Sequence, residues 1–291
     1  MNNNHHGSIG NIHPASLPDK LFFRLSKLIH TECGIKMPIA KKTMLEARLQ
    51  KRFRLLGMKS LREYCDYLFS PQGRDRELIN MIDVVTTNKT DFFREPLHFD
   101  YLVQKALPEL IEQYGAGTRR KLTVWSAGCS TGEEPYTLAM VLREFADRYQ
   151  RLYYLILATD ISTNVLEKAR RGIYGQEKAE LVPMPIKRKY FLKSKDRKKR
   201  LVRIVPELRA FVKFRRLNFM ESNFEMREPM DIIFCRNVII YFDRPTQERL
   251  LNRFCQHLIS GGYIFMGHSE TLNNMNVPLI QVSPTIYRKF E

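Results

Sequence analysis

The sequence contains no run of 18 or more apolar residues, so it lacks the length of apolar chain that a membrane-spanning helix needs. Its first residues, MNNNHHGSIGNIHPAS, do not show the charged and then apolar pattern of a secretory signal. The five cysteines are odd in number and include no C-x-x-C pair, which argues against a disulfide framework and against a zinc site. We therefore expect a cytoplasmic chain without membrane insertion and without a metal.

Negative charge is also scarce. The chain has 31 Asp and Glu residues against 48 Lys and Arg residues, which gives a formal net charge of +17 and a pI near 9.7. Such a field attracts nucleic acid, anionic membranes or acidic protein surfaces, and charge alone does not choose among them. The densest basic segment, 187-KRKYFLKSKDRKKRLVR-203, holds ten basic residues against the single acid Asp196. It is either a solvated loop face or a docking site.

The stretch 122-LTVWSAGCSTGEEPYTLAM-140 predicts a strand, a loop of small residues and the start of a helix. Only Gly128 and Gly132 approach the patterns of a phosphate cradle or a dinucleotide fingerprint, and no lysine follows them. Glu133 and Glu134 stand where the helix N-terminus would otherwise attract a phosphate, and their charge would repel one. The loop therefore favours a neutral or cationic ligand.

A further acidic residue, Asp160, closes the segment 153-YYLILATD-160, which has the length and composition of a buried parallel strand. An acidic side chain at this place in a βαβ unit can accept hydrogen bonds from a ribose diol. A nucleoside that carries positive charge and no phosphate, such as S-adenosylmethionine, suits both the loop and Asp160. The alternative is a structural turn that is followed by acidic residues at a helix N-terminus.

Residues 18–85, which follow a polar tail over residues 1–17, predict a small all-helical domain. Apolar periodicity, a serine cap and a terminal glycine indicate helices at residues 20–30, 41–57, 60–70 and 75–85. The second of these carries an apolar stripe made of Leu45, Leu49, Phe53 and Leu56. On its flank lie basic residues that form either a solvated face or a docking surface for an acidic partner, namely Lys41, Arg48, Lys51 and Arg52.

The rest of the chain predicts a linker over residues 86–98 and an α/β domain over residues 99–291. The linker segment 86-TTNKTDFFREP-96 contains more aromatic and charged residues than a simple spacer needs. Helix-like and strand-like segments then alternate, which is typical of an α/β sheet. Strands are expected near residue 122 and at residues 153–160, 230–238, 262–267 and 284–290. Basic, β-like pieces over about residues 183–210 interrupt this alternation and predict a small insertion.

Five motifs in order give the chain a strong resemblance to the CheR family of S-adenosylmethionine-dependent methyltransferases. They are TTNKTDFFRE (86–95), VWSAGCSTGEEPYTLAM (124–140), TDISTNVLEKARRGIY (159–174), FCRNVIIYFD (234–243) and GHSE (267–270). The family methylates glutamates on bacterial chemotaxis receptors. The resemblance implies an N-terminal all-helical domain, a linker and an α/β, Rossmann-like class I methyltransferase sheet with an inserted antiparallel β subdomain.

The resemblance also implies site residues. The cofactor contacts of the family fall on Asn88, Thr90, Arg94, Glu134, Asp160, Asn218, Phe219, Arg236 and Asn237. The catalytic positions fall on Arg94, as a clamp for the substrate carboxylate, and on Tyr241, which would line the methyl-transfer site. The basic flank Lys41, Arg48, Lys51 and Arg52 is then expected to dock the signalling domain of a methyl-accepting chemotaxis receptor.

The implied reaction needs no general base, because a substrate carboxylate attacks the methyl group without losing a proton. Positioning of the two reactants is worth about 7–11 kcal/mol of the barrier in such cases. His268 and Cys235 are therefore expected to be structural. S-adenosylhomocysteine would be the product, and we expect a monomer that binds no metal.

One loop departs from the relatives that bind a C-terminal receptor pentapeptide. Their insertion carries a loop patterned with glycine, whereas 194-SKDRKKR-200 is charged and has no glycine. Two other functions remain as alternatives. The basic charge is compatible with a nucleic-acid methyltransferase. Enzymes that methylate the amino groups of bases, however, carry a [DN]-P-P-[YF] motif at the end of the fourth strand, where this sequence has RNVIIYF. A non-catalytic protein that senses S-adenosylmethionine would keep the same pocket.

Overall fold

The computed structural model describes residues 17–149 and 152–290, and it divides into two compact units. The smaller unit contains the residues up to Leu28 and Met37–Val85, and the larger contains Ile29–Lys36 and Thr86 onward. The expected polar tail lies outside the described residues except for Leu17. This residue is buried and its backbone N–H donates to the Glu46 carboxylate over 2.7 Å, so it belongs with the helical unit and not with a tail.

The smaller unit is helical, as the family resemblance implies. Its elements are α1 (Asp19–Cys33), the short 3-10 helix η1 (Ile39–Lys41), α2 (Lys42–Leu55), α3 (Leu61–Phe69) and α4 (Pro71–Val85). Ser60 caps α3 by accepting the Glu63 N–H, as the serine in the sequence indicated. In α2 the predicted apolar stripe is buried at Leu45, Leu49 and Phe53. Leu56 does not belong to it, because α2 ends one residue earlier and Leu56 is 38% exposed.

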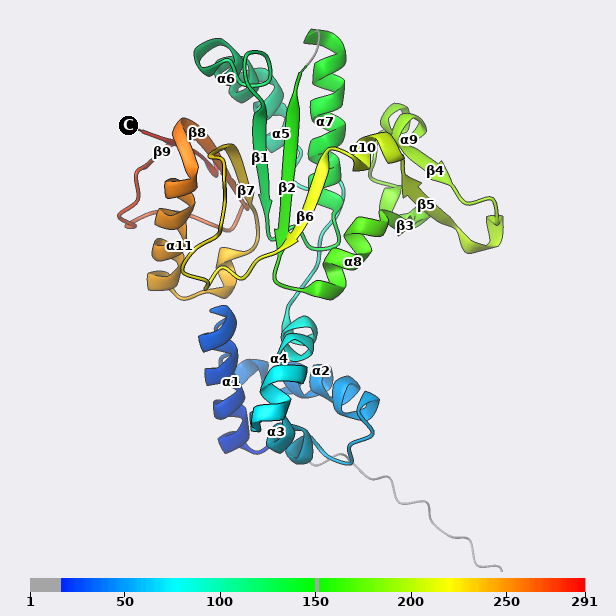
Figure 1. The fold of residues 1–291 in the computed structure, drawn as a ribbon, viewed down its shortest axis with the longest axis vertical. Helices are drawn as coiled ribbons and strands as arrows, with labels where there is room; N and C mark the ends of the chain where they lie inside the picture. The colour runs from blue at the N-terminus through cyan, green and yellow to red at the C-terminus, as the bar shows by residue number, and fades with distance from the viewer. Residues whose placement is uncertain (1–16, 150–151, 291) are drawn as a thin grey trace, which may run out of the picture. The chain divides into compact units, whose positions relative to one another are not determined.

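The larger unit is built on a seven-stranded sheet in the order β6-β2-β1-β7-β8-β10-β9 (Figure 1). Its strands are β1 (Leu122–Ala127), β2 (Tyr154–Asp160), β6 (Val212–Arg216), β7 (Met230–Cys235), β8 (Leu258–Met266), β9 (Leu279–Ser283) and β10 (Ile286–Lys289). The first five strands in this order are parallel, whereas β10 and β9 are antiparallel to their neighbours. The carboxyl ends of β2, β1 and β7 therefore meet at one edge of the sheet.

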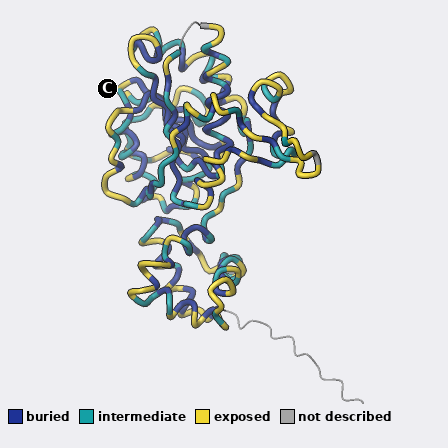
Figure 2. Tube along the Cα trace, turned by 45° about the vertical axis from the view of Figure 1, so that its right-hand side comes forward, coloured by how far each residue is buried: buried dark blue, intermediate teal, exposed yellow. Residues whose placement is uncertain are grey.

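Both faces of this sheet are covered, which explains why every residue of β1 is buried. Val124 faces a core shared with α5 (Leu97–Tyr101), the π-helix η2 (Leu102–Ala106), α6 (Leu107–Tyr114), α7 (Glu133–Tyr149) and α8 (Thr163–Arg171). Trp125 faces the opposite core, where it packs edge-on against Phe254 of α11 (Arg244–His257). Figure 2 shows the buried residues gathered along the central strands.

A second, three-stranded antiparallel sheet lies beside the main one (Figure 1). Its elements are β3 (Ile173–Gly175), η3 (Gln176–Ala179), α9 (Met184–Tyr190), β4 (Phe191–Lys193), η4 (Arg197–Lys199), β5 (Leu201–Ile204) and α10 (Pro206–Arg209), with β5 in the middle. The insertion thus begins about ten residues earlier than residue 183. Its first strand is three residues long, too short to show a periodic pattern. Strand β9 is missed for a related reason, because none of its residues is buried.

Candidate functional site

The candidate site lies where the loops after β1, β2 and β7 come together at the carboxyl edge of the sheet, which is where parallel α/β sheets bind ligands. The loop after β1 turns at Gly128 and Gly132, whose φ angles are +85° and +97°. A side chain at Gly128 would come within 2.5 Å of Val238, and one at Gly132 within 2.9 Å of Ala169. Both glycines are therefore required by conformation and by space.

Asp160 closes this loop. The carboxylate is buried and accepts the Ser130 N–H over 2.8 Å and the Ser162 N–H over 2.9 Å. These two hydrogen bonds fix the carboxylate at the end of β2. Asp160 is therefore both part of the loop and a rigid acceptor at the place where a ribose acceptor was predicted.

The segment 88–95, expected to be more than a spacer, is bound to the glycine loop and its surroundings. Ser130 Oγ donates to the Asn88 carbonyl over 2.9 Å. Lys178 Nζ, from η3 of the insertion, donates to the Thr90 carbonyl over 2.6 Å and pairs with Asp91 at 3.0 Å. Further along, the Thr137 hydroxyl of α7 accepts the Phe93 N–H, and Phe92 is buried against Tyr174 and Phe191. The segment is thus a fixed wall of the site.

A buried charge cluster joins this wall to the glycine loop. The Arg236 side chain is only 2% exposed and lies 3.4 Å from the Glu95 carboxylate and 3.5 Å from that of Glu134. It also donates to the Arg94 carbonyl. Glu134 accepts the Ser126 hydroxyl over 2.7 Å, and burial raises the pKa of the Glu134 carboxyl while Arg236 opposes that rise. One cation therefore holds two carboxylates in place at the edge of the loop.

The loop after β7 is held by Glu270, a residue to which the sequence analysis gave no role. Its buried carboxylate accepts the N–H groups of Asn237, Val238, Ile239 and Gly267 over 2.7–2.9 Å. Asn237 has a φ angle of +59°, and among the described residues no hydrogen-bond donor reaches its buried Oδ1. The only signal for Glu270 in the sequence was its place in the GHSE motif.

Glu95, His98 and His268 form a second cluster, in which the possible metal-ligand atoms all lie within 4.8 Å of one another. Glu95 is already close to the Arg236 guanidinium, which competes with a metal for the carboxylate. His98 is buried, its Nε2 lies 2.9 Å from the Thr285 hydroxyl, and burial lowers its pKa to about 4. The expectation that the protein binds no metal stays a prediction.

The remaining predicted site residues make hydrogen bonds or packing contacts within the protein. The Asn218 side chain donates to the Glu32 carbonyl over 2.5 Å and accepts the Met220 N–H, so both ends of its amide are engaged. Phe219 is 9% exposed and packs against Trp125 and Phe254, so its ring belongs to the core. Tyr241 ends the 3-10 helix η5 (Ile239–Tyr241), and its carbonyl accepts the Lys36 N–H.

Two residues of the predicted docking flank have partners within the helical unit. Arg52 donates two hydrogen bonds of 2.5 and 2.8 Å to Glu77, whose side chain is 2% exposed. A buried carboxylate needs such a partner, so Arg52 serves the interior of the helical unit. Arg48 likewise donates to the Val85 carbonyl. Of the four predicted residues, Lys51 is exposed and Lys41 is half-buried.

Two expected structural residues fit their surroundings. Cys235 is fully buried at the end of β7, and burial raises the pKa of its thiol well above the ordinary value, which disfavours the thiolate. The His268 side chain is exposed, and its backbone N–H points to the Glu95 carboxylate over 3.4 Å. Among the described residues, no helix has both the length and the apolar character to cross a membrane.

Comparisons with known proteins agree with the two units. The family model "CheR methyltransferase, SAM binding domain" matches residues 88–288, and "CheR methyltransferase, all-alpha domain" matches residues 20–86. The chain is 40% identical to the chemotaxis protein methyltransferase of Borreliella burgdorferi, over 91% of this chain and 93% of the relative. It is 37% identical to chemotaxis protein methyltransferase 2 of Pseudomonas aeruginosa, over 91% of each. The corresponding values for the Escherichia coli chemotaxis protein methyltransferase are 38%, 94% and 91%.

Proposed function

Because the chain belongs to the CheR methyltransferase family, we propose that it transfers a methyl group from S-adenosylmethionine to glutamate side chains of a chemoreceptor signalling domain. The products would be a glutamate methyl ester and S-adenosylhomocysteine. The main support for this proposal is that the segment 88–95 is bound to the glycine loop, beside Glu134, Arg236 and Asp160. The segment thereby completes a site instead of only connecting two units.

The hydrogen-bond acceptors and carboxylates of the site suit S-adenosylmethionine. Asp160 places a buried carboxylate at the end of β2, where ribose hydroxyls would bind, and Glu134 offers a carboxylate for the ammonium group of the methionine part. The Asn237 side chain adds a buried acceptor. Carboxylates at this edge of the sheet disfavour a phosphate-bearing ligand and favour a cationic one. When bound, S-adenosylmethionine supplies an activated methyl group on a positively charged sulfur.

The residues of the chain then have to position the second reactant. Arg94 donates to the Lys89 carbonyl over 3.2 Å, its side chain is 36% exposed, and its guanidinium has further N–H groups that can bind a substrate carboxylate. The Tyr241 carbonyl accepts the Lys36 N–H, which anchors the backbone, and the Tyr241 ring can then line the substrate entrance. No residue has to remove a proton, because a glutamate carboxylate is already ionised at neutral pH.

We also propose that the exposed Lys51 meets the acidic surface of the receptor, with the charged insertion loop 194–200 as a separate basic contact. Attraction of this kind is long-range, and salt screens it beyond about 8 Å at physiological ionic strength. It therefore raises the rate of encounter more than the strength of the final contact.

The test is a methylation assay with isotopically labelled S-adenosylmethionine and a purified receptor signalling domain. Base-labile label on the receptor, lost when the substrate glutamates are changed to alanine, is the expected result. Calorimetric titration with S-adenosylhomocysteine measures the cofactor site independently. Binding without transfer would favour a sensor of S-adenosylmethionine, transfer to DNA or RNA would favour a nucleic-acid methyltransferase, and absence of binding would refute the cofactor assignment.

A further inference from the structure

Helix α11 starts directly after the candidate site. Tyr241 ends η5, and Asp243 caps α11 by accepting the Thr246 N–H over 3.0 Å. The first residue of the helix, Arg244, is therefore only three positions beyond the predicted methyl-transfer tyrosine. From there to Arg253 the helix rises about 13 Å at roughly 1.5 Å per residue. A partner that enters the site can continue along the exposed side of this helix.

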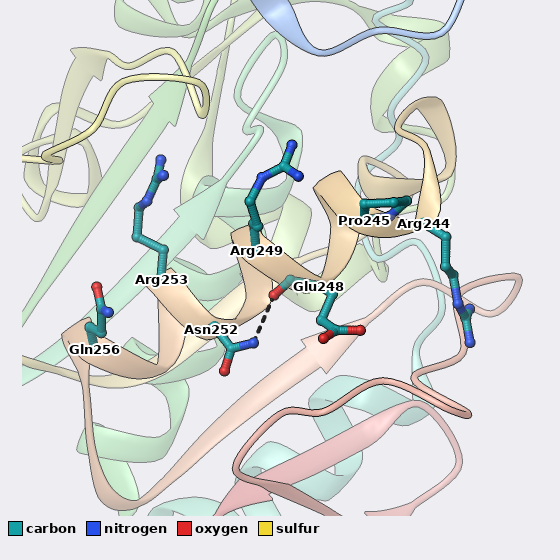
Figure 3. A pocket seen from close by; sticks show the side chains of 7 residues that line it. All are labelled: Arg244, Pro245, Glu248, Arg249, Asn252, Arg253 and Gln256. Atoms are coloured by element: carbon teal, nitrogen blue, oxygen red, sulfur yellow. Dashed lines mark hydrogen bonds between the residues drawn. The ribbon is translucent and has the colours of Figure 1, made fainter.

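The exposed side of α11 carries an open depression of about 580 Å³. It is lined by Arg244, Pro245, Glu248, Arg249, Asn252, Arg253 and Gln256, which we call the α11 face. Figure 3 shows Arg249 and Arg253 extending next to each other on one side of the helix, with Arg244 and Glu248 on the other side. A smaller cavity of about 120 Å³ lies against Arg249 and Arg253 and is lined by side chains that include Phe219 and Met220.

The arginines of the α11 face lack an ion-pair partner within the part of the chain that the structure describes. No carboxylate of residues 17–149 or 152–290 forms an ion pair with Arg244, Arg249 or Arg253. This differs from other basic side chains, such as Arg120 with Asp231 or Lys189 with Glu144 and Asp147. The face therefore offers unpaired guanidinium groups for binding.

Arg253 is also held in a fixed orientation. Its guanidinium donates to the carbonyls of Phe219 and Glu221 and lies 5.1 Å from the centre of the Phe224 ring. Arg249 donates to the Thr246 hydroxyl over 2.9 Å. Because these contacts already restrict both side chains, less conformational entropy is lost when a partner binds them.

We propose that the α11 face is a docking surface for the acidic helical segment that carries the substrate glutamates. This inference rests on the proposed function. Arg249 and Arg253 are four residues apart, so their stems are about 6 Å apart, which is also the spacing of carboxylates at positions i and i+4 of a partner helix. The lining residues include no aromatic side chain on which a nucleic-acid base could stack.

The experiment compares two charge-reversed variants of the full-length protein. The first combines Arg244→Glu with Arg249→Glu and leaves Arg253 intact, because Arg253 supports the Phe219 and Glu221 carbonyls. The matched control combines Lys105→Glu with Arg119→Glu, two exposed cations near α6 that produce the same change of net charge. The probe is a purified receptor signalling domain, assayed for methylation at low ionic strength, with S-adenosylhomocysteine titration as a check of folding.

The α11 variant is expected to lose about tenfold in kcat/KM, mostly through a higher KM, while the control stays within twofold of the wild type. Affinity for S-adenosylhomocysteine should be unchanged in both variants. Equal activity of the α11 variant and the control would overturn the docking surface and leave the proposed function intact. Inactivity of the wild type on the receptor would instead refute the proposed function and this inference together. Competition by duplex DNA that the α11 variant abolishes would identify the face as a nucleic-acid surface and overturn the proposal.

Discussion

The Asp160 carboxylate holds the glycine loop and is also the group proposed to bind the ribose of the cofactor. We expect Asp160→Ala to weaken binding of S-adenosylhomocysteine by about 1.5–3 kcal/mol, because a charged hydrogen-bond acceptor is lost. Calorimetric titration measures this change. Asp196→Ala, which removes an exposed carboxylate of the insertion loop, is the control and should bind like the wild type.

Arg94 should behave differently, because its side chain is proposed to act on the substrate. Arg94→Ala keeps the backbone carbonyl that accepts from Arg236, so the wall of the cofactor site remains. We expect turnover to fall by at least tenfold, while affinity for S-adenosylhomocysteine changes by less than about 1 kcal/mol. Steady-state kinetics and titration separate the two effects. A loss of affinity as large as that of Asp160→Ala would make Arg94 a cofactor contact instead.

His98 predicts a dependence of stability on pH. Burial and the neighbouring Arg236 lower its pKa from 6.5 to about 4, so the folded protein binds fewer protons than the unfolded chain between these values. Stability is therefore fully present above pH 6.5 and falls as the pH is lowered toward 4, by up to on the order of 3 kcal/mol from this residue. His98→Gln should flatten this part of a denaturation profile. A variant with the same acid sensitivity as the wild type would contradict the assignment.

Single residues also show how far sequence could predict the site. Asp160 was found because it closes a buried strand, and Glu134 because it follows the glycine loop at a helix N-terminus. Arg236 was implied only by the family resemblance. The role of Glu270 was not predictable in this way, because it depends on backbone N–H groups about 30 residues earlier in the chain. Arg52 looked like a surface cation because no local pattern identifies its partner Glu77, 25 residues away.

At the scale of elements, the insertion is connected to the wall of the site through Lys178 of η3. Lys178→Met removes the hydrogen bond to the Thr90 carbonyl and the ion pair with Asp91. We expect about fivefold weaker binding of S-adenosylhomocysteine, about 1 kcal/mol, since Lys178 is partly exposed and its charge is screened. The matched control is Lys189→Met, which breaks a surface pair with Glu144 and Asp147 and should leave binding unchanged.

The strands and helices could be predicted where burial leaves a recognisable pattern of apolar residues in the sequence. β1 and β2 carry continuous apolar runs because both faces of the sheet are covered, and α11 starts at a recognisable Asp cap. The elements that escaped prediction lack this signal. β3 has three residues, and β9 is an edge strand with no buried side chain, so tertiary pairing alone makes them strands.

For the whole molecule, the open question is how a receptor is brought to the site. The loop 194–200 is charged and lacks the glycines of relatives that bind a receptor pentapeptide. We therefore expect a receptor truncated at its extreme C-terminus to be methylated almost as fast as the intact receptor. Initial rates on the two substrates at equal concentration test this. A many-fold loss on truncation would show that tethering survives without the glycines.

The contact between Lys178 and Thr90 also limits how the protein can be recombined with its relatives. A chimera that exchanges residues 173–209 to transfer receptor preference would replace Lys178 as well. It would thereby lose a contact that holds the segment beside the proposed cofactor site. Such a chimera would test partner choice and cofactor affinity at the same time. Grafting the loop 194–200 alone, on the unchanged strands β4 and β5, leaves that contact in place and isolates recognition of the receptor from binding of the cofactor.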